Sequence, residues 1–115
     1  MDTETHSELE PICEKIRGNF DAKDSAREKG LTRSRAVIRN SANAIRAIHR
    51  GEFDDALALM QDSDVLLREV DDVLLNYPDV YHAGFVHDAQ KEHAEAHQTY
   101  ALILSEPSPI PTTSA

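Results

Sequence analysis

The chain has 115 residues, a formal net charge of −9 from 21 acidic and 12 basic side chains, and no tryptophan. This length suits one domain with a modest core. The acidity argues against nucleic-acid binding through bulk charge, so any such binding must use a local basic patch. The single cysteine, Cys13, excludes a disulfide framework and a zinc site built on thiolates. No apolar run is long enough for a membrane span and the acidic N-terminal stretch is unlike a signal peptide, so the sequence predicts a cytoplasmic protein.

The balance of charged residues also indicates a salt-rich environment. Only four of the 12 cationic side chains are lysines. A surface rich in Asp and Glu and poor in Lys is what a high-salt cytoplasm favours, because molar salt screens the repulsion between like charges over about 3 Å. We therefore expect a halophilic source.

Hydrophobic spacing predicts an all-α fold, an antiparallel bundle of long amphipathic helices. A first helix is expected over residues 8–24, with Pro11 in its first turn. Its apolar stripe consists of Leu9, Ile12, Ile16 and Phe20. A second helix is expected over residues 25–50, where Gly30 either kinks it or separates it from the first.

Glycine and proline predict where the following helices begin and end. Gly51 is expected to end the helix that precedes it and to place the next helix, residues 52–76, antiparallel beside it. The pair Tyr77-Pro78 is expected to end that helix, with Asp79 as the N-cap of a further helix over residues 81–104.

These patterns predict a domain organisation of an N-terminal, partly helical segment at 1–24, a helical domain at 25–104 and a Pro-rich loop or tail at 105–115. In the last helix, the apolar edge of Phe85, Leu102 and Ile103 has no obvious cover within the chain. Large exposed apolar patches are rare on monomers, so this edge predicts self-association.

Four arginines share one stripe of the helix over residues 25–50, within about 60° of each other by the 3.6-residue period. They are Arg35, Arg39, Arg46 and Arg50. One interpretation is a solvated face whose arginines pair with the abundant carboxylates. The other is a row of phosphate contacts, for which the planar guanidinium is a good bidentate donor. This stripe is the only candidate nucleic-acid surface in so acidic a chain.

Three carboxylates, Asp88, Glu92 and Glu95, share a narrow stripe of the last helix at positions i, i+4 and i+7. Stacked carboxylates repel each other unless water or a cation lies between them. A wet acidic face is one interpretation. The other is a divalent-cation site with hard oxygen ligands, because apolar residues border the stripe.

The same helix carries four histidines, His82, His87, His93 and His97. Their spacing does not match the two-histidine motif of zinc metalloproteases. One interpretation is that these histidines are ligands of a transition metal. Their spread around the helix favours the other, that they are polar or hydrogen-bonded surface residues.

A resemblance to a known family rests on the segment from Arg33 to Ala96. Its most specific part is the run Gln90-Lys91-Glu92-His93-Ala94-Glu95-Ala96, with the Arg50-Gly51-Glu52 turn and the Tyr77-Pro78 break in support. Over about residues 20–107 the chain resembles the translin/Trax family, and within it the archaeal translin-like proteins of Trax type. The chain looks like the N-terminal half of such a protein.

The resemblance implies an all-helical subunit of a closed oligomer, often an octamer, that binds single-stranded RNA or DNA. The oligomer would contain copies of this chain or a translin-type partner subunit. Trax-type subunits carry a metal-dependent endoribonuclease site, and the resemblance places Glu92 and Glu95 on its catalytic, metal-binding glutamates. The cofactor implied is Mg²⁺ or Mn²⁺. The family's third acidic ligand is an aspartate of a later helix, and Asp88 is a candidate replacement for it.

Three functions follow from the sequence. The first is single-stranded nucleic-acid binding with a Mg²⁺-dependent endoribonuclease site, complete or vestigial. The second is a nucleic-acid-binding oligomer without catalysis. The third is a helical interaction module, in which the acidic residues serve only solvation and the arginines pair with them.

Overall fold

The computed structural model describes the backbone of residues 3–105 and the side chains of residues 9–105. These residues form α1 (Thr3–His49), α2 (Phe53–Val73), α3 (Pro78–Tyr81) and α4 (Gly84–Ser105). The described part contains no strand, so the predicted all-α class is confirmed. Of the tail predicted at 105–115, Ser105 is the last residue of α4 and the other residues lie outside the described part of the chain.

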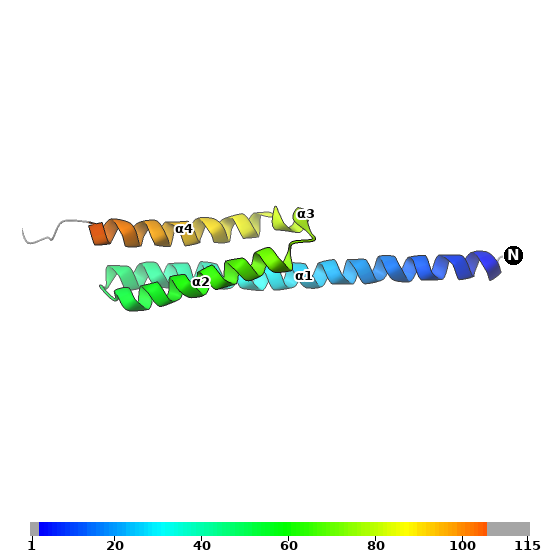
Figure 1. The fold of residues 1–115 in the computed structure, drawn as a ribbon, viewed down its shortest axis with the longest axis horizontal. Coiled ribbons are helices and arrows are strands. Elements are labelled where there is room, and N and C mark those ends of the chain that lie inside the picture. Colours follow the sequence, from blue (N-terminus) through cyan, green and yellow to red (C-terminus); the bar gives the residue numbers. More distant parts are fainter. Residues whose placement is uncertain (1–2, 106–115) are drawn as a thin grey trace, which may run out of the picture.

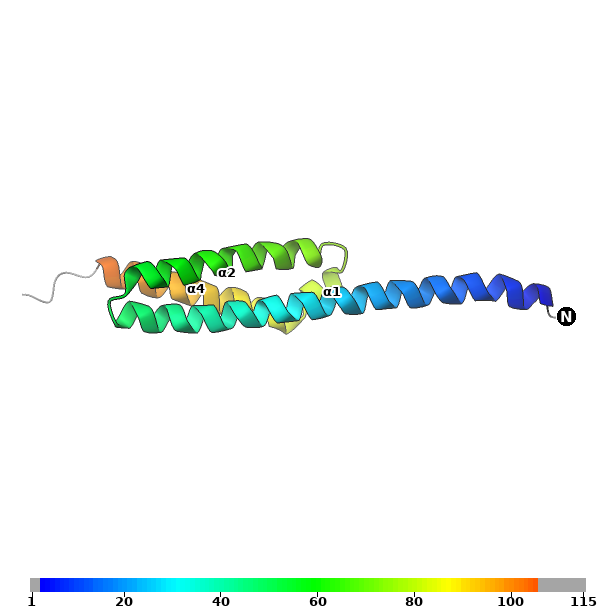
Figure 2. The same ribbon diagram turned by 90° about the horizontal axis from the view of Figure 1, so that it is seen from below.

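Helices α2 and α4 lie alongside the C-terminal half of α1, while the N-terminal half of α1 extends beyond them (Figures 1 and 2). The molecule is accordingly long and narrow, with extents of 95 × 19 × 15 Å. Helix α2 runs antiparallel to α1, and α4 turns back to run antiparallel to α2 (Figure 1). No helix within residues 3–105 is long and apolar enough to cross a membrane.

Helix α1 is continuous over 47 residues, so the two helices predicted before Gly51 are one. Pro11 lies inside this helix rather than in its first turn. Gly30 neither kinks nor divides this helix. Its lack of a side chain matters instead for the packing of α1 against the end of α2. A Cβ at Gly30 would lie 3.0 Å from Leu74 Cδ1, so glycine is what allows the end of α2 to approach α1 this closely.

The turn between α1 and α2 is a Schellman motif, as the glycine predicted. Gly51 has φ +77°, a left-handed conformation that suits glycine. The N–H of Glu52 donates to the carbonyl of Ala47 at 2.8 Å, and the N–H of Gly51 donates to the carbonyl of Ile48 at 3.0 Å. These bonds satisfy carbonyls at the end of α1 and send the chain back along it.

The second connection differs from the prediction. Helix α2 ends at Val73, and Pro78 begins the single-turn helix α3 with Tyr77 as its N-cap. Asp79 therefore lies inside α3 and does not cap α4. Its carboxylate pairs with Lys23 on α1, and this partner lowers the pKa of Asp79. A tertiary ion pair has taken the place of the predicted local cap.

The core divides into two clusters along the bundle. At the α1–α2 turn, residues from three helices pack together: Ala44, Ala47 and Ile48 from α1, Ala56 and Met60 from α2, and Ala96 from α4. At the other end, Ala26, Val70, Leu74, Val80 and Val86 form the second cluster. Alanines dominate the first cluster because small side chains let the three helix backbones approach closely.

The apolar edge predicted on the last helix is mostly covered within the chain. Ile103 packs against the first cluster and Phe85 against the second, so the prediction that both lack a cover is wrong. Leu102 is 62% exposed. The larger exposed apolar surface is on the protruding part of α1, and it consists of Leu9, Ile12, Ile16 and Phe20.

Candidate functional site

Three of the four arginines predicted to share a face lie on the side of α1 that points away from the bundle, and Arg50 lies in the turn that follows α1. Arg35, Arg39 and Arg46 are exposed. Val37 and Ala44 are fully buried on the opposite side. At about 100° per residue, Arg46 lies half a turn away from Val37. The packing of α1 against α2 and α4 therefore leaves the arginine face open to solvent.

The partners of these arginines differ. Arg50 donates from Nε to Glu52 Oε1 at 2.8 Å and from Nη2 to Oε2 at 3.3 Å. This pair raises the pKa of Arg50 and lowers that of Glu52. Arg46 Nη1 donates to the neutral Oδ1 of Asn43 at 2.6 Å. The side chains of Arg35 and Arg39 have no hydrogen bond or ion pair with the residues that the structure describes. Three of the four guanidinium groups are thus not paired with a carboxylate within the described chain.

The predicted carboxylate stripe lies along α4. Asp88 and Glu95 are exposed, and Glu92 is half-buried. None of the three carboxylates has a hydrogen bond or ion pair with another described side chain. The oxygens of these three carboxylates do not all lie within 4.8 Å of one another. Among the described residues, the only group of three or more His, Cys, Asp and Glu side chains with ligand atoms within 4.8 Å of one another has other members.

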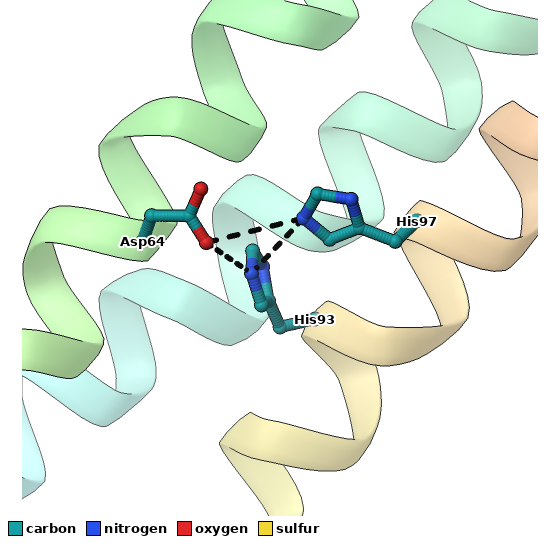
Figure 3. A network of polar contacts seen from close by, with 3 residues as sticks. All are labelled: Asp64, His93 and His97. Carbon is teal, nitrogen blue, oxygen red and sulfur yellow. Dashed lines mark hydrogen bonds and ion pairs between the residues drawn. The ribbon is translucent and has the colours of Figure 1, made fainter.

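That group consists of Asp64 from α2 and His93 and His97 from α4 (Figure 3). His93 Nε2 lies 2.7 Å from Asp64 Oδ1 and 3.1 Å from His97 Nε2. His97 Nε2 lies 3.9 Å from the same carboxylate oxygen. The two imidazole rings meet edge to face, with centroids 4.4 Å apart. We refer to these three residues as the Asp-His-His cluster.

Local helix geometry explains how the cluster forms. His93 lies four residues after Ala89 and three before Ala96, so it shares their buried face, and His97 follows it one turn later. Asp64 follows the buried Ser63 on α2, at the edge of that helix's buried face. Only 12% of the His93 side chain is exposed, and its Nδ1 is buried without a hydrogen-bond partner. His93 therefore meets its polar neighbours through Nε2 alone.

This cluster is not among the sites that the sequence predicts. The predicted arrangement spreads His82, His87, His93 and His97 around the helix, but His93 and His97 converge on one point. The i, i+4 spacing of the pair was the available signal, because residues four apart lie on one helix face. Asp64 lies 29 residues before His93, and no pattern in the sequence connects the two.

Comparisons with known proteins add no relative to this picture. No family model matches the chain, and no curated protein or solved structure is significantly similar to it. The class defined by the fold is an all-α helical bundle. The translin/Trax resemblance stays a prediction.

Proposed function

We propose that this chain binds single-stranded nucleic acid, RNA or DNA, through the face of α1 that carries Arg35, Arg39 and Arg46. The observation that supports the proposal is that these guanidinium groups have no carboxylate partner among the described residues, although acidic side chains outnumber basic ones by 21 to 12 in the chain. Exposed cations in such a chain have many acidic groups to pair with. A row kept free of carboxylate partners suits phosphate oxygens, to which guanidinium donates bidentate hydrogen bonds.

The spacing of the arginines fits an extended strand. The α-helical rise separates Arg35 from Arg39 by about 6 Å along the axis and Arg39 from Arg46 by about 10 Å. Phosphates of a single strand could meet these groups in succession along one straight edge. The function is also the one that the resemblance to translin and Trax implies.

Reversing the charge of Arg35 and Arg39 should weaken this binding. For the variant Arg35→Glu/Arg39→Glu we expect at least about a tenfold loss of affinity for a labelled single-stranded RNA, measured by fluorescence anisotropy. The slope of log affinity against log salt should fall by about 1.4, because each phosphate contact on a single strand contributes about 0.7.

The matched control is Arg27→Glu/Arg68→Glu, which changes the net charge equally at exposed positions away from the arginine face. We expect the control to keep the salt slope of the unmodified chain. Equal losses in the two variants would show that net charge, rather than this face, governs binding.

A second proposed function is Mg²⁺- or Mn²⁺-dependent hydrolysis of the bound RNA, with Glu92 and Glu95 as metal ligands and Asp88 as a third candidate. The observation that favours it is Glu92, which is half-buried and has no partner among the described side chains. A cation held by these carboxylates would lower the pKa of a bound water and neutralise charge on the phosphate. Mg²⁺ keeps most of its coordination shell for water and phosphate, so few protein ligands are needed.

For the variant Glu92→Gln/Glu95→Gln we expect Mn²⁺ binding at this stripe and any RNA cleavage to be lost. RNA binding should persist or tighten, because two negative charges near the phosphates are removed while the side-chain shapes are kept. The control Glu14→Gln/Glu28→Gln removes the same charge from exposed positions of α1. Cleavage that survives the first variant, in a preparation free of contaminating nuclease, would refute the catalytic role.

The proposed functional unit is an oligomer in the cytoplasm of a halophile, either of this chain alone, with an octamer as the family's common form, or with a translin-type partner subunit. The exposed apolar stripe of the protruding part of α1 supports association. A reducing compartment also suits Cys13, which is a free and exposed thiol.

A further inference from the structure

We propose that the Asp-His-His cluster binds a divalent transition metal of the Zn²⁺ class. The ligand atoms are one carboxylate oxygen, Asp64 Oδ1, and two imidazole nitrogens, His93 Nε2 and His97 Nε2. All three atoms point toward one another in the space between α2 and α4 (Figure 3). This site is separate from the carboxylate stripe proposed for Mg²⁺ and does not depend on nucleic-acid binding.

The triangle of ligand atoms has the size that zinc requires. Its edges are 2.7, 3.1 and 3.9 Å, and the point equidistant from all three atoms lies about 2.0 Å from each. One face of a tetrahedron around Zn²⁺, with ligands at about 2.0–2.1 Å, has an equivalent radius of about 1.9 Å. An ion would therefore fit close to this plane with small movements of the side chains.

The donor set selects the class of metal. Imidazole nitrogen suits Zn²⁺, Cu²⁺, Ni²⁺ and Fe²⁺, whereas Mg²⁺ and Ca²⁺ prefer oxygen ligands throughout. Two histidines with one carboxylate form the three-ligand set of several catalytic zinc sites, which keep a fourth position for water. The side chains of Asp64 and His97 are 43% and 49% exposed, so solvent can reach that position.

Without a metal, the cluster has too few hydrogens for its acceptors. If His93 carries a hydrogen on Nε2 and donates it to Asp64, that hydrogen is not available to the lone pair of His97 Nε2, although the two Nε2 atoms lie 3.1 Å apart. If His97 also carries a hydrogen on Nε2, the two N–H groups oppose each other. One cation in the centre accepts all three lone pairs and removes this conflict.

The metal would also connect two helices that make little contact elsewhere. Helices α2 and α4 each pack mainly against α1 and only slightly against each other. The contacts of Asp64 with the two histidines are the only side-chain polar links between α2 and α4 that the described residues contain. Metal binding to the folded bundle should thus raise its thermal stability.

The test is titration of the 115-residue chain, first freed of metal, with Zn²⁺ by calorimetry. We expect one ion per chain and an increase in Tm. Replacement of Zn²⁺ by Co²⁺ should give the visible absorption of a tetrahedral site. In His97→Gln and Asp64→Asn the affinity should fall at least about tenfold, since even the loss of an outer-shell partner costs 10- to 100-fold.

Two controls separate this site from others. His87→Gln removes an exposed histidine of α4 outside the cluster and should leave zinc affinity unchanged. Glu92→Gln/Glu95→Gln should also leave it unchanged, which distinguishes the cluster from the carboxylate stripe. The proposal is overturned if the chain binds no zinc, or if His97→Gln and Asp64→Asn, shown to be folded by circular dichroism, bind it as tightly as His87→Gln does. The first outcome would identify the cluster as a hydrogen-bonded triad.

Discussion

Replacing Ile48 with alanine is expected to destabilise the bundle by about 2–5 kcal/mol. Ile48 is 2% exposed and lies in the cluster where α1, α2 and α4 meet. Its neighbours there are mostly alanines, whose side chains have no rotamers with which to fill the cavity. Each kcal/mol shifts the Tm of a domain of this size by about 4–8 °C, so a fall of about 8 °C or more should appear in thermal unfolding followed by circular dichroism.

The control for Ile48→Ala is Leu75→Ala, which removes a similar side chain that is 75% exposed. Substitutions at such positions change stability by less than about 0.5 kcal/mol in most proteins. Similar losses in the two variants would mean that the helices do not pack around Ile48 as the structure shows.

The second large effect is expected on the oligomeric state. The protruding part of α1 exposes Ile12 by 55%, Ile16 by 63% and Phe20 by 69%, all on one stripe. A helix without tertiary contacts is marginal in water, and Pro11 and Gly18 weaken this one further. Burial of the stripe against another copy would supply the missing stabilisation. We expect the unmodified chain to self-associate, and Ile12→Ser/Ile16→Ser to be monomeric or much more weakly associated, as measured by light scattering at high salt.

The matched control is Leu102→Ser/Leu104→Ser, which removes two exposed leucines from the end of α4. This variant should remain associated if the stripe on α1 forms the interface. Loss of association in the control alone would place the interface on α4, at the edge that includes Leu102. A monodisperse monomer of the unmodified chain would contradict both assignments.

The sequence by itself determined the helical class, the turn at Gly51 and the faces of the helices. These features depend on local physics. Glycine tolerates the left-handed conformation that ends α1, and the 3.6-residue period decides which residues share a face. For this reason the row of Arg35, Arg39 and Arg46 could be predicted.

Local signals failed where a contact with another helix decided the outcome. Aspartate is a residue type that often caps helices, but Asp79 lies inside α3 and its carboxylate pairs with Lys23 on α1. Glycine weakens helices, so Gly30 predicted a kink or a break. In the structure the side chain of Leu74 packs against Gly30, in the place that a Cβ would need. Phe85 was predicted to lack a cover at the edge of α4, but it packs against a cluster to which the other helices contribute most of the residues.

The candidate sites divide in the same way. The arginine and carboxylate stripes each lie on a single helix, so helical periodicity alone placed their members side by side. The Asp-His-His cluster needs two helices in register, because Asp64 comes from α2 and the histidines come from α4. Periodicity states which face of a helix a residue occupies, but the packing of α2 and α4 against α1 decides which faces meet. Only the tertiary structure could therefore bring these three side chains together.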